Sequence, residues 1–221
     1  MVFWVTIFGV LIISWLITRS LRKTAFAPLG MFLSLLLVAV PVFFLVRPSG
    51  DLRLIGLICG SAIVFLLGLW SDLKGVPIAL RAALVIGAAL VAYKLGIRIE
   101  SIKRPFSSEF VPLGPWSMPL TVAWISIFAL AFNLSNLLAG LNEGLILITA
   151  TVFLIITLWQ QHEPLLTALL CGAVISISLG GFSFAPRYWL PNLKSLFFGF
   201  LLACISVTGS LKNTALLIVL L

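Results

Sequence analysis

The chain has 221 residues, of which 62% are hydrophobic and 9% are charged, and its formal net charge is +8. Together with a mean hydropathy of +1.26, this composition excludes a soluble domain, because apolar runs long enough to cross a bilayer follow one another along the chain. The basic residues lie in short connections rather than in a cluster with aromatic residues. They therefore indicate membrane topology and contact with anionic headgroups, and we expect no nucleic-acid partner.

We predict an all-α fold, a polytopic transmembrane bundle that forms one membrane domain over residues 1–221. About eight apolar runs have the length of a transmembrane helix, and in chain order they are 2–18, 29–46, 52–70, 78–93, 118–132, 145–159, 165–179 and 195–211. The first run lacks the basic start and the cleavage site of a signal peptide, so we expect a retained helix. The basic residues divide equally between the two sides of this arrangement and therefore give no orientation.

Two connections between these helices carry local patterns. Residues 71–77 read as a short polar loop after the third helix. Between the fourth and fifth helices, apolar and polar residues alternate from Gly96 to Ile102, and a second short apolar segment, Phe110–Leu113, follows a turn rich in proline and serine. This pattern predicts a small hairpin on the membrane surface.

The stretch from Leu130 to Leu145 is polar where a bilayer would favour apolar residues. It contains Asn133, Asn136, Asn142 and Glu143 between two long apolar runs. Polar groups in lipid are costly unless they are paired, so such a cluster is a candidate functional site. The alternative is a set of amide hydrogen bonds that hold membrane helices together.

Four segments, taken in order, resemble the polyprenyl-phosphate N-acetylhexosamine-1-phosphate transferases, also called glycosyltransferase family 4. The segments are Arg22-Lys23 followed by Pro28-Leu29-Gly30, then 68–75 (GLWSDLKG), 130–145 (LAFNLSNLLAGLNEGL) and 187–200 (RYWLPNLKSLFFGF). The resemblance implies transfer of a sugar 1-phosphate from a nucleotide sugar to a lipid phosphate, assisted by Mg²⁺. It also implies a bacterial inner-membrane protein whose odd-numbered connections, which carry the motifs, face the cytoplasm.

The chain departs from this family at the acidic positions. Ser71 stands for the first of two paired aspartates, which leaves Asp72, and Asn136, Ala139 and Asn192 also stand where the family has aspartates. An alternative alignment with the archaeal and eukaryotic branch makes the central asparagines native residues. This alternative alignment still leaves Ser71 and Asn192 at positions where the family has aspartates.

The motif positions give the candidate site residues. Relic catalytic candidates are Asp72, Asn133, Asn136 and Asn192, and the candidates for binding substrate are Lys74, Asn133, Arg187 and Lys194. Asp72 is the candidate metal ligand; we expect no cofactor unless the chain is active, in which case Mg²⁺ is required. Each residue also has a structural interpretation: Asp72 as a cap or turn residue, the amides as bonds between helices, and the basic residues as determinants of topology.

Our leading hypothesis is a pseudoenzyme, a relative without most catalytic aspartates that acts as a subunit of a membrane complex or as a lipid-binding scaffold. The expected partners are membrane lipids, with polyprenyl phosphate as a candidate, and other membrane proteins. The alternative is a divergent active Mg²⁺-dependent N-acetylhexosamine-1-phosphate transferase that uses Asp72 and Glu143. A third hypothesis is a small transporter.

Overall fold

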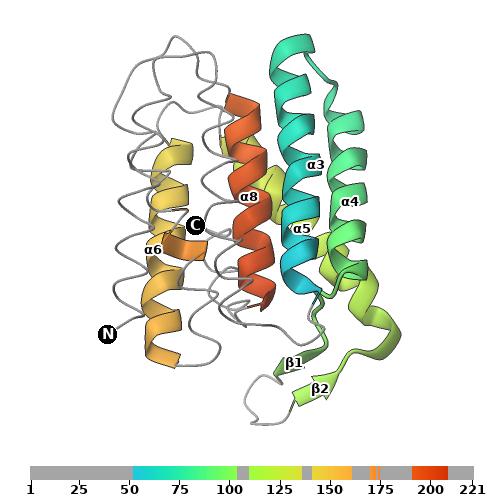
Figure 1. Ribbon diagram of the computed structural model, residues 1–221, viewed down its shortest axis with the longest axis vertical. Helices are drawn as coiled ribbons and strands as arrows, with labels where there is room; N and C mark the ends of the chain where they lie inside the picture. Colours follow the sequence, from blue (N-terminus) through green and yellow to red (C-terminus); the bar gives the residue numbers. More distant parts are fainter. Residues whose placement is uncertain are drawn as a thin grey trace.

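The computed structural model describes residues 52–103, 110–135, 141–160, 170–172, 174 and 191–208. These residues are mostly helical and form a bundle with a pair of short strands at one end (Figure 1). The predicted helices 2–18 and 29–46 lie outside the described residues. Of the predicted helix 165–179, the structure describes residues 170–172 and 174, which are helical.

The first two described helices form an antiparallel pair. α3 (Arg53–Lys74) and α4 (Ile78–Lys94) are joined by a tight turn in which Gly75 adopts a left-handed φ of 68° and donates its backbone N–H to the Ser71 carbonyl at 3.0 Å. Glycine is suited to this helix end because it has no Cβ. Residues 71–74 therefore belong to the last turn of α3, and the polar loop that we predicted there begins only at Gly75.

An extended segment follows α4 and leads into two strands. Ile97 and Ile99 are buried, whereas the alternate residues Arg98 and Glu100 are exposed. β1 (Ser101–Lys103) pairs antiparallel with β2 (Phe110–Pro112), with Ile102 opposite Val111. β2 lies within the second segment predicted for the hairpin, whereas β1 overlaps the first segment, 96–102, only at residues 101–102. The connection of the hairpin, 104–109, lies outside the described residues, and its position on the membrane surface stays a prediction.

A short 3₁₀ helix, η1 (Gly114–Trp116), leads into α5 (Ser117–Leu134), which is followed by α6 (Leu141–Gln160) and α8 (Pro191–Thr208). α8 begins about one turn before the predicted helix 195–211, so Asn192 and Lys194 are helical. Hydropathy could not show this, because the first turn of α8 is polar.

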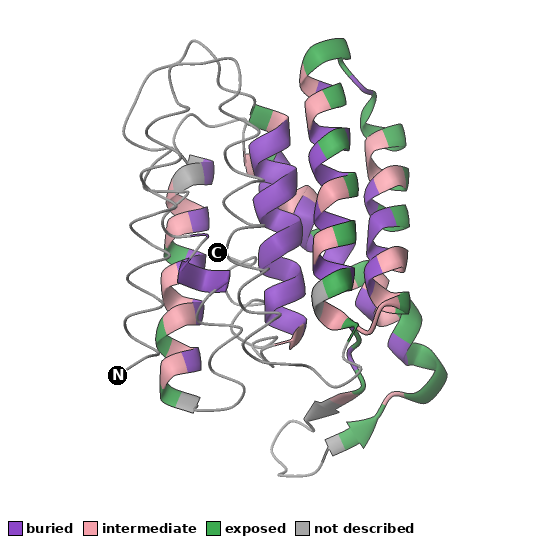
Figure 2. Cartoon of the chain, viewed as in Figure 1, coloured by how far each residue is buried: buried purple, intermediate pink, exposed green. Residues whose placement is uncertain are grey.

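α8 is the central helix of the described bundle. It packs against α3, α5 and α6, and every residue from Leu193 to Val207 is buried (Figure 2). A helix that is buried around its whole circumference is a core helix rather than an amphipathic surface helix. The arrangement of α3, α5 and α6 therefore follows from their contacts with α8, whereas α4 packs against α3 and α5.

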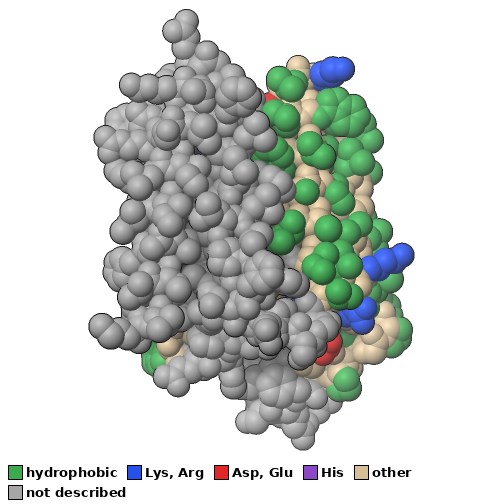
Figure 3. Space-filling model, viewed as in Figure 1, with side chains coloured by type: hydrophobic (Ala, Val, Ile, Leu, Met, Phe, Trp, Pro, Cys, Tyr) green, Lys and Arg blue, Asp and Glu red, His purple; other side chains and the backbone are tan. Residues whose placement is uncertain are grey.

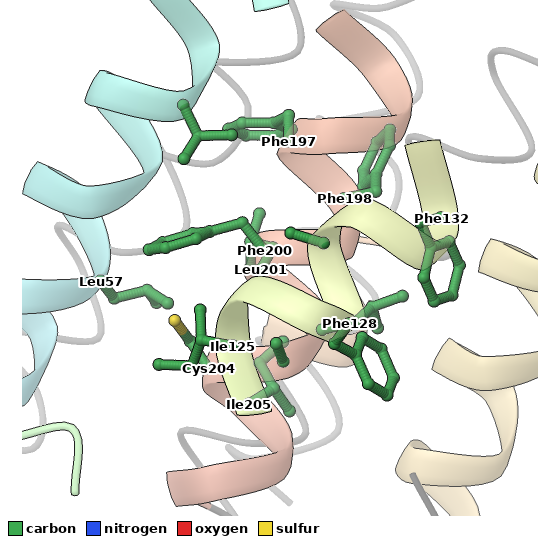
Figure 4. Close-up of a cluster of buried hydrophobic side chains, with 14 of the residues drawn as sticks. Leu57, Ile125, Phe128, Phe132, Phe197, Phe198, Phe200, Leu201, Cys204 and Ile205 are labelled. Atoms are coloured by element: carbon green, nitrogen blue, oxygen red, sulfur yellow. The ribbon is translucent and has the colours of Figure 1, made fainter. Parts of the chain in front are cut away.

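Aromatic side chains fill the space around α8. Phe197, Phe198 and Phe200 of α8 lie in one cluster with Phe128 and Phe132 of α5 (Figure 4). Phe197 also meets Phe65 of α3 edge to face, with 6.0 Å between the ring centroids. Offset and edge-to-face arrangements of this kind are the favourable ones for aromatic pairs.

Two glycines let α8 approach its neighbours closely. A Cβ on Gly68 of α3 would lie 2.4 Å from Leu193 Cα, and one on Gly199 of α8 would lie 3.0 Å from Ala129 Cα of α5. Both contacts involve backbone atoms, which cannot move aside as a flexible side chain can. Close backbone approach at small residues is typical of helix packing in membranes. The contact at Gly68 also places the first turn of α8 directly beside the end of α3.

The described part of the chain is that of a membrane protein. Three helical segments, Ile55–Lys74, Gly114–Leu134 and Pro191–Thr208, are long and apolar enough to cross a bilayer, and a shorter apolar segment covers Gly144–Trp159. Large apolar side chains are exposed on the described helices, among them Leu66, Leu73, Ile127 and Trp159, and Figure 3 shows such side chains over the face that is not covered by grey atoms. An apolar outer surface of this kind suits contact with lipid.

Candidate functional site

Polar side chains from four helices meet at the end of the bundle remote from the two strands. Here α3 and α5 end and α4 and α8 begin, as the chain directions in Figure 1 require. The group, which we call the Asp72 cluster, consists of Asp72, Arg81, Asn133, Asn192 and Ser195. Three of its members, Asp72, Asn133 and Asn192, were candidates from the sequence.

Asp72, in the last turn of α3, receives hydrogen bonds on both carboxylate oxygens. Oδ1 accepts the Asn192 backbone N–H at 3.1 Å and the Asn192 Nδ2–H at 2.7 Å, and Oδ2 accepts the Leu193 N–H at 2.8 Å. The first N–H groups of a helix have no partner within the helix, and the helix dipole favours an anion at that end. Asp72 therefore caps α8, a helix far away in the sequence.

Arg81, in the first turn of α4, joins α5 to α8. Its Nη1 donates to Asn133 Oδ1 at 2.7 Å and to Asn192 Oδ1 at 2.8 Å, and its Nη2 donates to the Val76 carbonyl at 3.0 Å. The Nε atom is buried and has no hydrogen-bond partner within the described part of the chain. The guanidinium thus holds a permanent positive charge against the oxygen atoms of both amides.

Asn133 completes the link between α5 and α8. It is 7% exposed, and its Nδ2 donates to Asn192 Oδ1 at 3.1 Å and to Ser195 Oγ at 2.9 Å. Ser195 Oγ in turn lies 2.9 Å from the Pro191 carbonyl, to which it donates. Both atoms of the Asn133 amide group therefore have partners, as buried amides require.

The remaining candidates are distributed differently. Lys74 is exposed at the end of α3, and Lys194, in the first turn of α8, is 4% exposed. Ser71, where the resemblance implied an aspartate, is buried, and its hydroxyl has no hydrogen-bond partner among the described residues. Asn136 and Arg187 lie outside the described residues, as does the side chain of Glu143.

Arg81 and Ser195 are the members of the cluster that the sequence interpretation missed. The sequence did contain a signal for Arg81, because an arginine within a predicted transmembrane helix is a functional candidate by default. Ser195 carried no such signal, since serine is common in membrane helices and often bonds to its own helix. Only the packing of α5 against α8 shows that it pairs with Asn133.

The described side chains do not fit a Mg²⁺ site. Mg²⁺ prefers an octahedral set of oxygens that includes one or two carboxylates. Asp72 is the carboxylate of the cluster, its oxygens are occupied by N–H donors, and the guanidinium of Arg81 lies at the amide oxygens that could otherwise bind a cation. The described residues contain no group of three or more His, Cys, Asp or Glu side chains placed to hold a metal ion.

Comparison with known proteins identifies a family. The model of glycosyl transferase family 4 matches residues 54–210, which is most of the chain. The chain is 27% identical over 169 residues to a probable undecaprenyl-phosphate N-acetylglucosaminyl 1-phosphate transferase of Bacillus subtilis, a match that covers 75% of this chain and 47% of the relative.

A second relative is a phospho-N-acetylmuramoyl-pentapeptide-transferase of Listeria innocua, 28% identical over 111 residues, which cover 49% of this chain and 34% of the relative. The chain thus spans less than half the length of either relative. The family match includes all four helices that build the Asp72 cluster. The chain belongs to glycosyl transferase family 4.

Proposed function

We propose that this chain is a membrane scaffold of glycosyl transferase family 4 in which the residues at the family's catalytic centre hold the helices together instead of catalysing a reaction. The observation that carries this proposal is the bonding of the Asp72 cluster. Asp72 caps α8, and Arg81 binds the side-chain oxygens of Asn133 and Asn192. The oxygens that a metal would need are thus satisfied by N–H donors.

Electrostatics supports the same conclusion. A catalytic site for two phosphate-bearing substrates needs cations that are available to those substrates. Here the positive charge of Arg81 is used within the protein, and the one carboxylate of the cluster lies at the positive end of the α8 dipole. Charged groups that are bonded to neighbouring amide groups in this way stabilise a helix arrangement, and we infer that Mg²⁺ is not bound there.

The proposal extends to location and partners. The relatives are named for transfer to undecaprenyl phosphate and for transfer of phospho-N-acetylmuramoyl-pentapeptide. We propose that this chain resides in the inner membrane of a bacterium, with the Asp72 cluster at the cytoplasmic end. There it would contact polyprenyl phosphate or other membrane lipids and pack with further membrane proteins through its apolar outer surface.

A turnover assay tests the loss of catalysis. The purified chain in nanodiscs is given UDP-N-acetylglucosamine, undecaprenyl phosphate and Mg²⁺, and release of UMP is followed, with the Bacillus subtilis relative as positive control. We expect no turnover above that of empty nanodiscs. Turnover that requires Mg²⁺ and disappears in Asp72→Asn would overturn the proposal.

The second candidate function is a divergent active sugar-1-phosphate transferase. One observation favours it: residues from three family motifs, Asp72, Asn133 and Asn192, do converge at one end of the bundle. The same assay separates the two functions. A Mg²⁺ requirement together with loss of activity in Asp72→Asn would identify the active enzyme and make Asp72 part of its site.

A further inference from the structure

A second polar site lies at the opposite end of the bundle from the Asp72 cluster. A half-open cavity of about 150 Å³ lies between the start of α3, the segment after α4, the start of β1 and the end of α8. Its lining includes Arg53, Gly96, Arg98, Glu100, Ser101 and Thr208. This headgroup cavity, as we call it, lies just beyond the membrane-spanning segments that begin at Ile55 and end at Thr208. Its depth is therefore that of the lipid headgroups.

The backbone places two opposite charges on the same side of one extended segment. Ile97 and Ile99 are buried, at 0% and 2% exposure, and the Ile99 N–H donates to Thr121 Oγ1 at 2.9 Å. Successive side chains of an extended segment point to opposite sides. Arg98 and Glu100 are therefore both exposed, and both line the cavity. Figure 3 shows basic and acidic side chains near one another at this end of the described helices.

The guanidinium of Arg98 is held in position without a carboxylate partner. Its Nε donates to the Tyr93 carbonyl at 3.2 Å, and its Cζ lies 5.0 Å from the centre of the Tyr93 ring. A cation over an aromatic face and a hydrogen bond through Nε leave both terminal nitrogens available to a ligand. Within the described part of the chain, neither Arg98 nor Glu100 forms an ion pair, although both line the same cavity.

The start of α3 adds to the positive potential of the cavity. Its N-cap residue is Leu52, which provides no side-chain acceptor for the first N–H groups of the helix. These groups and the helix dipole favour an anionic group near Arg53. Glycine at position 96, with φ of 103°, keeps the opposite wall free of a side chain; a Cβ there would lie 3.3 Å from Arg53 Cγ.

We propose that the headgroup cavity binds the zwitterionic headgroup of phosphatidylethanolamine, with its phosphodiester on Arg98 and its ammonium on Glu100. Two opposite charges that line one cavity without pairing suit a ligand that bridges them. The phosphodiester can accept two N–H bonds from the guanidinium, and the primary ammonium can donate to the carboxylate. Phosphatidylglycerol lacks the cation, and the trimethylammonium of phosphatidylcholine has no N–H to donate.

Native mass spectrometry of the full chain tests this binding. The protein is released from nanodiscs of phosphatidylethanolamine, phosphatidylglycerol or phosphatidylcholine, and the lipid that it retains is counted for wild type, Arg98→Gln and Glu100→Gln. Lys94→Gln is the matched control, because Lys94 is exposed at the same end but does not line the cavity.

We expect wild type and Lys94→Gln to retain phosphatidylethanolamine in preference to the other two lipids. Arg98→Gln should weaken retention of phosphatidylethanolamine roughly tenfold, and Glu100→Gln should abolish its preference over phosphatidylglycerol. Equal retention of the three lipids by wild type, or variants that behave like Lys94→Gln, would overturn the assignment.

A soluble analogue separates a lipid from a free phosphodiester. Glycerophosphoethanolamine carries the same headgroup without acyl chains. In detergent it should compete only weakly with phosphatidylethanolamine, because it lacks the contacts that the lipid chains make. Tight binding of this compound in the absence of lipid would assign the cavity to a soluble ligand instead. None of these results depends on whether the Asp72 cluster is catalytic, so the two proposals fail separately.

Discussion

Arg81 places a permanent positive charge between two asparagines that the family motifs had marked as site residues. It connects α5 to α8 within the Asp72 cluster, because the amide oxygens of Asn133 and Asn192 accept from the guanidinium. The sequence predicted Asp72, Asn133 and Asn192 as members of a shared site. It could not predict their bonding, since that depends on which residue of α4 faces α5 and α8.

Removing the guanidinium should destabilise the bundle. In Arg81→Met the Asn133 Oδ1 atom loses its donor, while Asn192 Oδ1 keeps the donor Asn133 Nδ2. An unsatisfied buried polar group costs about 1–3 kcal/mol. We expect a lower unfolding temperature in detergent, with Lys74→Met as the control because Lys74 is exposed. Arg81→Lys should restore only part of the loss, since an ammonium lacks the planar fork of the guanidinium. Equal unfolding temperatures for Arg81→Met and Lys74→Met would contradict this role.

The carboxylate of Asp72 should protect the first turn of α8. Loss of a capping acceptor costs about 0.5–2 kcal/mol, so Asp72→Ala should speed hydrogen exchange at the amides of Asn192 and Leu193, which donate to it. Asp72→Asn keeps one acceptor oxygen and should have a smaller effect. Unchanged exchange at these two amides in Asp72→Ala would show that Asp72 does not cap α8.

Among the elements, hydropathy predicted the positions of α3, α4, α5, α6 and α8 but not all of their ends. Runs of apolar residues end where polar residues begin, whereas a helix ends where its hydrogen bonding ends. Ser71, Asp72 and Lys74 are polar yet helical, because Asp72 bonds to the first turn of α8 and the helix ends only at Gly75. α8 likewise begins before its apolar run, at Pro191, because N–H groups of its first turn donate to Asp72.

Packing of α8 against α3 should depend on the absence of a side chain at position 68. In Gly68→Ala the new Cβ would meet the backbone of Leu193 at 2.4 Å, and overpacking of this kind typically costs about 1–3 kcal/mol. The matched control is Gly87→Ala, where nothing lies within 4 Å of the new atom and helix propensity favours alanine. We expect Gly68→Ala to lower the unfolding temperature and Gly87→Ala not to lower it. A similar loss in both variants would argue against close packing at Gly68.

The whole molecule has two chemically different ends. The Asp72 cluster lies where α4 begins, and the headgroup cavity lies beyond the point where α4 ends. The basic residues give no orientation from the sequence because their numbers balance, and the resemblance alone assigns the motif-bearing end to the cytoplasm. The sequence also gave no sign of the cavity, whose wall combines residues from distant helices.

Cysteine labelling tests the orientation of the molecule. Lys74 is the last residue of α3 and Lys94 is the last residue of α4. Both are exposed, and because the two helices are antiparallel they lie at opposite ends of the bundle. In a background with the three native cysteines replaced, Lys74→Cys should resist a membrane-impermeant maleimide in intact cells and react after the membrane is opened. Lys94→Cys should react in intact cells. The reverse pattern would contradict a cytoplasmic Asp72 cluster.

The burial of α8 has a consequence for how the protein is made. Among the described helices α8 is synthesised last, yet it is the one that α3, α5 and α6 pack around. The earlier helices are therefore synthesised before α8 exists, and the surfaces that later receive α8 cannot yet be covered by it. Completion of the core must follow synthesis of α8, and the Asp72 cap on its first turn can form only at that late step of biogenesis.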